Sequence, residues 1–167
     1  MIIRRATKDD VQALCEVHVQ SWKETYQGIV KEKYLQALRP ENKCPLWSDV
    51  VNTEEVLLAE RDGEVVGFTC AGRQHGDDYP QYEAELYTIY LLAKEQGKGT
   101  GERLFEAAVQ SVIRQGLHSM VVFVLDENPS TQFYEKMGAR KIDEVEAVIG
   151  DDVYKEAVYA WETLLEE

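Results

Sequence analysis

A short glycine-rich run, KEQGKGTG over residues 94–101, constrains this chain more than any other part of its sequence. Residues 83–92 before it alternate as a β-strand does, and the residues after it carry an apolar stripe of helical spacing. A glycine-rich turn between a strand and a helix presents several backbone N–H groups at the positive end of the helix dipole. The run therefore predicts a cradle for an anion such as phosphate, and glycines that only permit a tight turn are the alternative.

Two common phosphate-binding motifs do not fit this run. A P-loop is excluded because the pattern G-x-x-x-x-G-K-[ST] cannot be written here. A dinucleotide-binding fingerprint fits at Gly97 and Gly99 but needs its third glycine where the chain has Glu102. Asp126 would be the ribose-binding acid, yet only 41 residues follow it, too few to complete a doubly wound parallel sheet.

Hydrophobic periodicity over the rest of the chain predicts short strands and amphipathic helices in a single domain, residues 1–167. We expect strands over residues 1–6, 56–60, 65–69, 83–92, 120–125, 142–148 and 153–161. We expect helices over residues 11–27 and 32–38, from the glycine-rich run to Gly116, and over 130–136. Asp62-Gly63 predicts a hairpin, so the sheet is mixed, and residues 41–53 are expected to be loop or one helical turn.

The charge of the chain limits its partners. A net charge of −13 and a pI near 4.7 repel phosphate backbones and anionic lipids, so we expect neither a nucleic-acid nor a membrane partner. The acidity serves solubility alone or also attracts a cationic substrate. No apolar run has bilayer length and the N-terminal MIIRRATKDD lacks a signal-peptide core, so we expect a cytoplasmic protein.

The three cysteines, Cys15, Cys44 and Cys70, are scattered along the chain without a C-x-x-C pair. This spacing indicates neither a disulfide framework nor a zinc knuckle, so we expect reduced, packed thiols. The three histidines also lack metal-ligand spacing, and no metal is expected.

Two motifs in the expected order carry a family resemblance. Gln96-x-x-Gly99-x-Gly101 follows the long strand, and NPS at 128–130 with FYEKMG at 133–138 follows the next strand. With these motifs the chain resembles the GNAT N-acetyltransferase superfamily over nearly its whole length. The resemblance implies an α/β fold with a mixed, mostly antiparallel sheet of six or seven strands flanked by helices. It also implies acetyl-CoA as co-substrate, wedged between the fourth and fifth strands.

The resemblance implies cofactor-binding positions as well. The pyrophosphate would be held by the backbone amides of Gln96, Gly97, Lys98, Gly99, Thr100 and Gly101. The backbone of Leu91 and Ala93 would pair with the pantetheine arm, to which Asn128 would hydrogen-bond. Ala93 stands where a proline is frequent in the family, and Ala139 stands where phenylalanine is common, but neither change removes a polar group that the chemistry needs.

Acetyl transfer to an amine needs a base, because an amine is mostly protonated at neutral pH. Strict alternation over residues 83–92 places Glu83 and Glu85 on one face, together with Tyr87, Ile89 and Leu91. Glu85 is our first candidate for the base, and Glu83 is the second and a candidate for substrate binding. A solvated or salt-bridged strand carboxylate is the alternative for Glu85.

Tyrosine and tryptophan supply the remaining candidates. Tyr134 would protonate the departing thiolate, or it is a tyrosine packed between helix and sheet. Trp22 and Tyr26, with Tyr34 nearby, lie where the family forms a wall of the acceptor site and would receive a cationic amine through their rings. At helical spacing these aromatics also suit a protein core.

Together these inferences predict an acetyl-CoA-dependent N-acetyltransferase. It would act on a primary amine, of a small molecule or a protein, by direct attack in a ternary complex. The alternative is a non-catalytic acyl-CoA-binding sensor or interaction module, since a fold can outlast its chemistry. A homodimer is left open.

Overall fold

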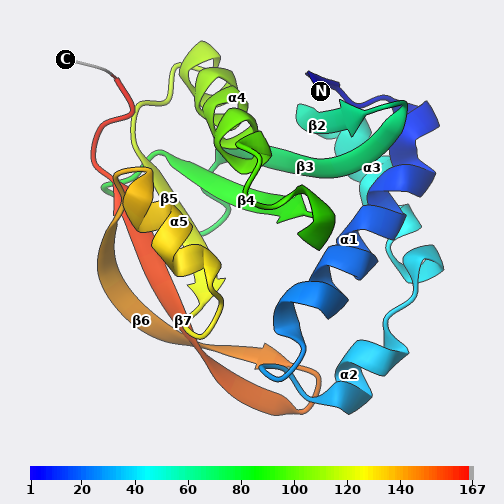
Figure 1. Cartoon of the computed structure of the whole chain (residues 1–167). Coiled ribbons are helices and arrows are strands. Elements are labelled where there is room, and N and C mark those ends of the chain that lie inside the picture. The colour runs from blue at the N-terminus through cyan, green and yellow to red at the C-terminus, as the bar shows by residue number, and fades with distance from the viewer. Residues whose placement is uncertain (166–167) are drawn as a thin grey trace.

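In the computed structural model, described over residues 1–165, the chain forms a seven-stranded mixed sheet between helices (Figure 1). The strands are β1 (Ile2–Arg5), β2 (Val56–Arg61), β3 (Glu64–Arg73), β4 (Ala84–Leu91), β5 (Met120–Leu125), β6 (Arg140–Ile149) and β7 (Asp152–Trp161). They lie in the order β1-β2-β3-β4-β5-β7-β6. Only β4 and β5 pair in parallel, so the expected mixed, mostly antiparallel sheet is confirmed.

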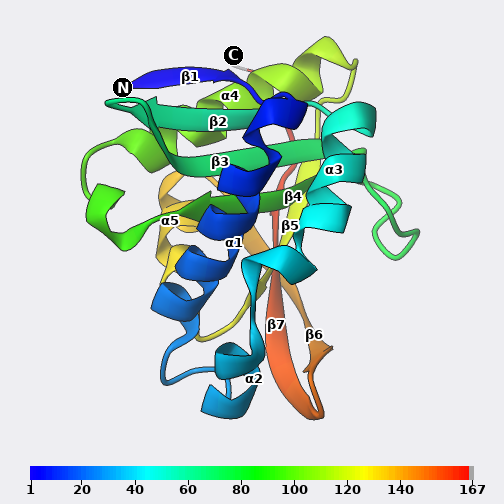
Figure 2. The ribbon, with the colours of Figure 1, turned by 90° about the vertical axis from the view of Figure 1, so that its right-hand side faces the viewer.

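The helices cover both faces of this sheet. They are α1 (Val11–Tyr26), α2 (Glu32–Ala37), α3 (Cys44–Thr53), α4 (Thr100–Arg114) and α5 (Ser130–Lys136), with 3-10 turns η1 (Lys8–Asp10), η2 (Pro40–Asn42) and η3 (Ala93–Glu95). One core joins α1 and α3 to β2 and β3, and another joins α4 and α5 to β4, β5 and β7. Figure 2 shows α1 and α3 in front of the sheet, with α2 beside the β6–β7 hairpin. Within residues 1–165 no helix is long and apolar enough to cross a membrane.

The tight turns predicted from the sequence are present. Asp62 and Gly63 both have positive φ, 53° and 80°, at the turn between β2 and β3. This is the backbone conformation that a two-residue hairpin requires, and an Asp-Gly pair adopts it readily. The predicted antiparallel hairpin at Asp62-Gly63 is confirmed.

Residues 44–53 form helix α3, so the expectation of a loop or single turn there is wrong. Pro45 lies in the first turn of the helix, where its missing N–H has no partner to lose and its fixed φ suits helix entry. Trp47 and Val51, one turn apart, are the buried residues of α3. The proline that seemed to break structure in the sequence instead begins a helix.

Packing of α3 on α1 also changes the cysteine assignment. Cys15 in α1 and Cys44 in α3 form a disulfide, with Cα atoms 5.5 Å apart. The expectation of reduced thiols is therefore wrong for this pair, because 29 residues of sequence separation conceal a contact made by two helices. Cys70 is the free, buried cysteine of the described residues.

A bulge in β4 breaks the predicted alternation of that strand. The register with β3 shifts between Cys70 and Ala71, which face Thr88 and Leu86 and leave Tyr87 as the extra residue. Tyr87 consequently packs in the core beneath α1, whereas Ile89 and Leu91 pack toward α4. The expectation that Glu85, Tyr87, Ile89 and Leu91 share one face is wrong.

Strands β4 and β5 separate soon after they meet. Their parallel pairing consists of Ala84 with Met120 and Glu85 with Val121, and within residues 1–165 the rest of β4 has no strand partner on that side. Figure 1 shows the two strands diverging, with α5 beside β5 and α1 beyond the far end of β4. The expected splay of the fourth and fifth strands is present, and it exposes backbone groups of β4.

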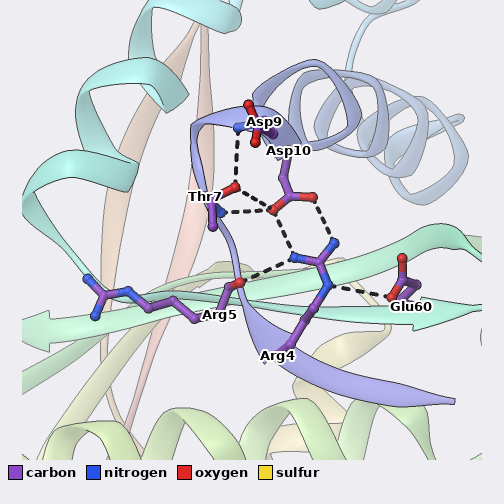
Figure 3. A network of polar contacts seen from close by, with 6 residues as sticks. All are labelled: Arg4, Arg5, Thr7, Asp9, Asp10 and Glu60. Carbon is purple, nitrogen blue, oxygen red and sulfur yellow. Dashed lines mark hydrogen bonds and ion pairs between the residues drawn. The ribbon is translucent and has the colours of Figure 1, made fainter.

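A polar network fixes the start of α1, the helix that carries Trp22 and Tyr26 (Figure 3). Arg4 donates to both carboxylate oxygens of Asp10, at 2.8 and 2.9 Å, and its Nε donates to Glu60 at 3.5 Å. The hydrogen bond from Arg4 lowers the pKa of Asp10 to about 2, against an opposing effect of burial. The backbone N–H of Thr7 donates to Asp10, which completes a capping box with Thr7 as the N-cap.

Candidate functional site

A cavity of about 940 Å³ occupies the space where β4 and β5 separate. Its walls come from α1, β4, the glycine-rich loop, β5, α5 and the tip of the β6–β7 hairpin. The cavity reaches from the loop at one end to aromatic side chains of α1 and α2 at the other. It has the size of a pocket for a small molecule or cofactor.

The glycine-rich loop presents free backbone donors to this cavity. Gly97 and Gly99 have φ of 78° and 81°. A Cβ atom added to either glycine would meet no atom within 4 Å beyond its chain neighbours, so the loop backbone faces open space. The N–H groups of residues 97–99 make no hydrogen bond within residues 1–165, and those of Thr100 and Gly101 begin α4, where no intrahelical acceptor exists. The N–H of Gln96 donates to the carbonyl of Ala93 at 3.1 Å, so the free donors begin at Gly97. This set fits an anionic phosphate group.

A buried carboxylate supports the loop from below. Glu95 is 2% exposed and accepts hydrogen bonds from Arg61 Nε at 2.8 Å and Thr100 Oγ1 at 3.0 Å. Lys98 Nζ lies 3.5 Å from the same carboxylate. Burial acts to raise the pKa of Glu95, but the hydrogen bonds from Arg61 and Thr100 outweigh it, and the pKa lies below its usual value. Glu95 thus joins η3 to the first residue of α4 and holds both sides of the loop.

The predicted pantetheine-binding backbone lies along the exposed edge of β4. Leu92 N donates to Val66 of β3, so the alternation of a strand turns the N–H of Leu91 toward the gap beside β5. Ala93 N donates instead to Glu24 of α1 at 3.2 Å. Leu91 and Ala93 both line the cavity, but only Leu91 keeps a free group on this edge.

Asn128 lines the cavity with its side chain already engaged. Its Nδ2 donates to the Tyr26 hydroxyl at 2.9 Å, and its Oδ1 accepts from Ser130 N at 2.8 Å, at the start of α5. Both contacts lie in a region that is almost closed to solvent, since Asn128 is 7% exposed. Asn128 therefore links α5 to α1 across the cavity.

Tyr134 of α5 lines the same cavity and is buried. Burial raises the pKa of its phenol well above the ordinary value, and the neighbouring phenols of Tyr26 and Tyr90 add to the shift. The hydroxyl therefore stays protonated at physiological pH and is available as a hydrogen-bond donor. Tyr134 also packs against Trp161 and Tyr159, so it has a structural contact as well.

Aromatic rings form the end of the cavity away from the loop. Trp22 lies with its ring centroid 4.2 Å from that of Tyr26 and 6.2 Å from that of Tyr34. Trp22 Nε1 donates to the hydroxyl of Tyr90 on β4 at 3.4 Å. The structure thus brings the predicted Trp22 and Tyr26 together with Tyr34 and adds Tyr90, which sequence reasoning did not select for this site.

The two predicted carboxylates, Glu85 of β4 and Glu83 just before it, do not line the cavity. Glu85 accepts a hydrogen bond from His75 N at 3.2 Å, and the exposed Glu83 accepts one from His118 N at 3.0 Å. Glu156 of β7 does line the cavity, and it lies close enough to Tyr26 of the aromatic wall for its charge to raise the pKa of that phenol. Sequence reasoning missed it because its place depends on the pairing of β7 with β5, although an acid directly before the buried run AVYAW was a usable signal.

Glu156 and Thr88 are cavity residues with unmet bonding capacity. Glu156 is half-buried and makes no hydrogen bond or ion pair with residues 1–165. Burial raises its pKa, and the nearby negative charge of Glu85 raises it further. Thr88 Oγ1 is buried without a hydrogen-bond partner in the described chain. Both side chains are therefore available to a polar ligand.

His18 supports the aromatic wall from behind. Its ring stacks on that of Tyr90 with centroids 4.8 Å apart, and its Nδ1 accepts a hydrogen bond from Trp47 Nε1 at 3.0 Å. Burial lowers the pKa of His18 to about 4, with a smaller contribution from the charge of Lys43. His18 is therefore neutral at pH 7.

Over residues 1–165 no three His, Cys, Asp or Glu side chains gather in an arrangement that could hold a metal ion.

A protein family model and a bacterial protein both match this chain. The model of the acetyltransferase (GNAT) family matches residues 12–139, which include α1, the glycine-rich loop and α5. The Bacillus subtilis protein named uncharacterized N-acetyltransferase YuaI is 30% identical over 162 residues, which is 97% of this chain and 93% of that protein.

Solved structures share the fold. PaiA N-acetyltransferase from Thermoplasma acidophilum, in complex with coenzyme A, is 25% identical with a TM-score of 0.72 over 93% of this chain and 96% of that one. The Salmonella typhimurium protein yncA, solved with acetyl-CoA, is 22% identical with a TM-score of 0.75 over 100% and 95% of the two chains.

Proposed function

The chain belongs to the acetyltransferase (GNAT) family, and from that premise we propose that it transfers an acetyl group from acetyl-CoA to a primary amine. The transfer occurs by direct attack of the amine in a ternary complex. The observation that carries this proposal is the row of free N–H groups from Gly97 to Gly101, which opens into a cavity of about 940 Å³.

The residues around the cavity fit the arm of coenzyme A. The free donors of the loop suit a diphosphate, and the unpaired edge of β4 at Leu91 suits an amide-bearing chain that adds to the sheet. Asn128 and Tyr26 close the opposite wall of the cavity through their hydrogen bond. The complexes of the two solved relatives with coenzyme A and acetyl-CoA support the same assignment.

Each chemical requirement of acetyl transfer has a candidate residue. Acetyl-CoA, when bound, supplies the activated acetyl thioester. Glu156 accepts the proton of the incoming ammonium, directly or through a water, and its raised pKa makes it a better base than an ordinary carboxylate. Tyr134 donates its phenolic hydrogen bond to the departing sulfur. Glu85 acts on this step only by raising the pKa of Glu156.

Direct transfer is favoured over a covalent acyl-enzyme because no reactive thiol is at hand in the described residues. Cys70 is 2% exposed, and burial raises its pKa to about 12. Cys15 and Cys44 are joined to each other. A buried thiol of high pKa is a poor nucleophile, so the amine itself makes the attack.

Release of free CoA thiol during incubation with acetyl-CoA and a panel of amines tests the proposal. At least one amine should accelerate release, and double-reciprocal plots at several amine concentrations should intersect, as a ternary complex requires. Acetyl-CoA binding without turnover for any acceptor would replace the proposal with a non-catalytic sensor. Parallel plots would remove direct attack and require an acyl-enzyme.

A further inference from the structure

We infer that the aromatic end of the cavity selects amines that carry no carboxylate, and that Glu156 binds their ammonium group. The inference rests on the proposed acetyl transfer and names the class of acceptor. Its substrates are alkyl or arylalkyl amines and diamines. The free α-amino acids that share their side chains are poor acceptors.

The charges that line the cavity are the first reason. They belong to Glu24, Glu102, Lys136 and Glu156, so Lys136 is the sole cation in the lining drawn from residues 1–165. Its Nζ lies 2.5 Å from Glu102 at the start of α4, on the side of the glycine-rich loop. A substrate carboxylate at the aromatic end would meet no positive charge, and an unpaired charge in a partly closed site is costly.

The surroundings of Glu156 are the second reason. Two nearby lysines are occupied by other acids: Lys31 pairs with Asp152 at 2.8 Å, and Lys141 pairs with Glu144 at 2.6 Å. Lys155, the neighbour of Glu156 along β7, points to the opposite face of the sheet and does not line the cavity. Glu85, on the far side of β5, adds negative charge near Glu156. The carboxylate of Glu156 is therefore uncompensated in the described chain, and an ammonium group is the ligand that would neutralise it.

The aromatic walls are the third reason. Trp22, Tyr26 and Tyr34 line the cavity and place their ring systems close together beside the segment that carries Glu156. Aromatic faces attract a cation and also cover the methylene groups of an alkyl chain. Rings and one carboxylate together recognise an organic cation, whereas recognition of a carboxylate would require arginine, lysine or free N–H groups.

The proton and group balance agrees with this assignment. The docked ammonium gives one proton to Glu156, which leaves the amine with a free electron pair. A bond then forms between that nitrogen and the acetyl carbon, while the carbon–sulfur bond breaks and the sulfur takes the phenolic proton of Tyr134 as CoA thiol. The nitrogen returns one proton to Tyr134 and keeps its last one as the amide N–H. Glu156 then releases its proton to water, so each turnover yields one net proton and no further reactant is needed.

Matched pairs of amine and amino acid test the inference directly. The pairs are cadaverine with lysine, agmatine with arginine, and tyramine with tyrosine, each measured as kcat/KM with saturating acetyl-CoA. In at least one pair the amine should exceed its amino acid by at least about 30-fold, the factor for leaving one buried charge unpaired. Amino acids that match or exceed their amines in every active pair would overturn the inference.

A charge-neutral variant tests the residue. Glu156→Gln should lower kcat/KM for the preferred amine by at least about 30-fold and reduce its advantage over the amino acid, with acetyl-CoA affinity unchanged. Glu146→Gln is the matched control, because it removes the same charge from an exposed position on the neighbouring strand β6. Glu156→Gln with the activity and selectivity of this control would contradict the role of Glu156.

These outcomes are separable from failure of the proposed function. If acetyl-CoA binds and amino acids alone are acetylated, the acceptor class is wrong and acetyl transfer stands. If no compound accelerates CoA release, acetyl transfer itself fails, and the acceptor inference falls with it. A variant that does not fold leaves the wild-type pairs as a complete test of the acceptor class.

Discussion

Replacing Arg61 with methionine should destabilise the protein through the carboxylate that it leaves behind. Arg61 Nε lies 2.8 Å from Glu95, whose side chain is 2% exposed. Removing one partner of a buried ion pair costs about 3–5 kcal/mol. Because Thr100 and Lys98 still contact Glu95, we expect the lower end of that range, about 3 kcal/mol.

Urea unfolding followed by tryptophan fluorescence measures this loss, and a thermal scan should show a Tm lower by about 6–12 °C for a chain of this size. The control is Lys94→Met, which breaks an exposed ion pair of η3 with Glu64 and should cost less than about 1 kcal/mol. The double variant Arg61→Met/Glu95→Met should recover most of the lost stability, because an apolar pair can replace a buried ion pair of similar volume.

The same variant should also weaken acetyl-CoA binding, because Glu95 joins η3 to Thr100 and so fixes both sides of the glycine-rich loop. Calorimetry on the folded single variant measures the change. If Arg61→Met costs no more stability than Lys94→Met, the idea that a buried charge under the loop is held by Arg61 is refuted.

Three further predictions address chemistry, acid stability and backbone conformation. Tyr134→Phe should lower kcat by at least about tenfold with acetyl-CoA affinity little changed, and an unaltered kcat would remove Tyr134 from the mechanism. The pKa of His18 falls from 6.5 to about 4 on folding, so the unfolded chain binds more protons between these values. Stability should therefore fall by about 3 kcal/mol as pH drops through that window, and urea unfolding of His18→Phe should lack this part of the slope. Gly99→Ala, at a φ of 81°, should cost about 1–2 kcal/mol and weaken acetyl-CoA binding, whereas a calorimetric affinity equal to wild type would show that the loop tolerates the change.

Local patterns predicted the elements whose cause is local. The hairpin at Asp62-Gly63, the glycine-rich loop and the buried strand β5 each follow from a few neighbouring residues, and the structure contains all three. The helix α3 was missed because Pro45 stops a helix in the interior and starts one in the first turn, and the sequence alone did not indicate which applies.

The candidate site was less predictable because it depends on contacts between distant segments. Glu85 pairs with Val121 of β5 before the two strands separate, so it lies outside the cavity. The extra residue at Tyr87 changes which later side chains of β4 share a face. Glu156 reaches the cavity only through the pairing of β7 with β5. Neither a bulge nor a strand order has a reliable local signal, so sequence reasoning chose Glu85 and did not consider Glu156.

The proposed function depends on the N–H groups from Gly97 to Gly101 binding the diphosphate of acetyl-CoA. Calorimetry with two ligands tests this binding most directly. Acetyl-CoA should bind the wild-type protein, and acetyl-pantetheine, which lacks the diphosphate, should bind at least about 100-fold more weakly, the equivalent of two charge-assisted hydrogen bonds. Equal affinity for the two ligands, or no heat of binding with acetyl-CoA at millimolar concentration, would contradict the assignment of the loop as the diphosphate site.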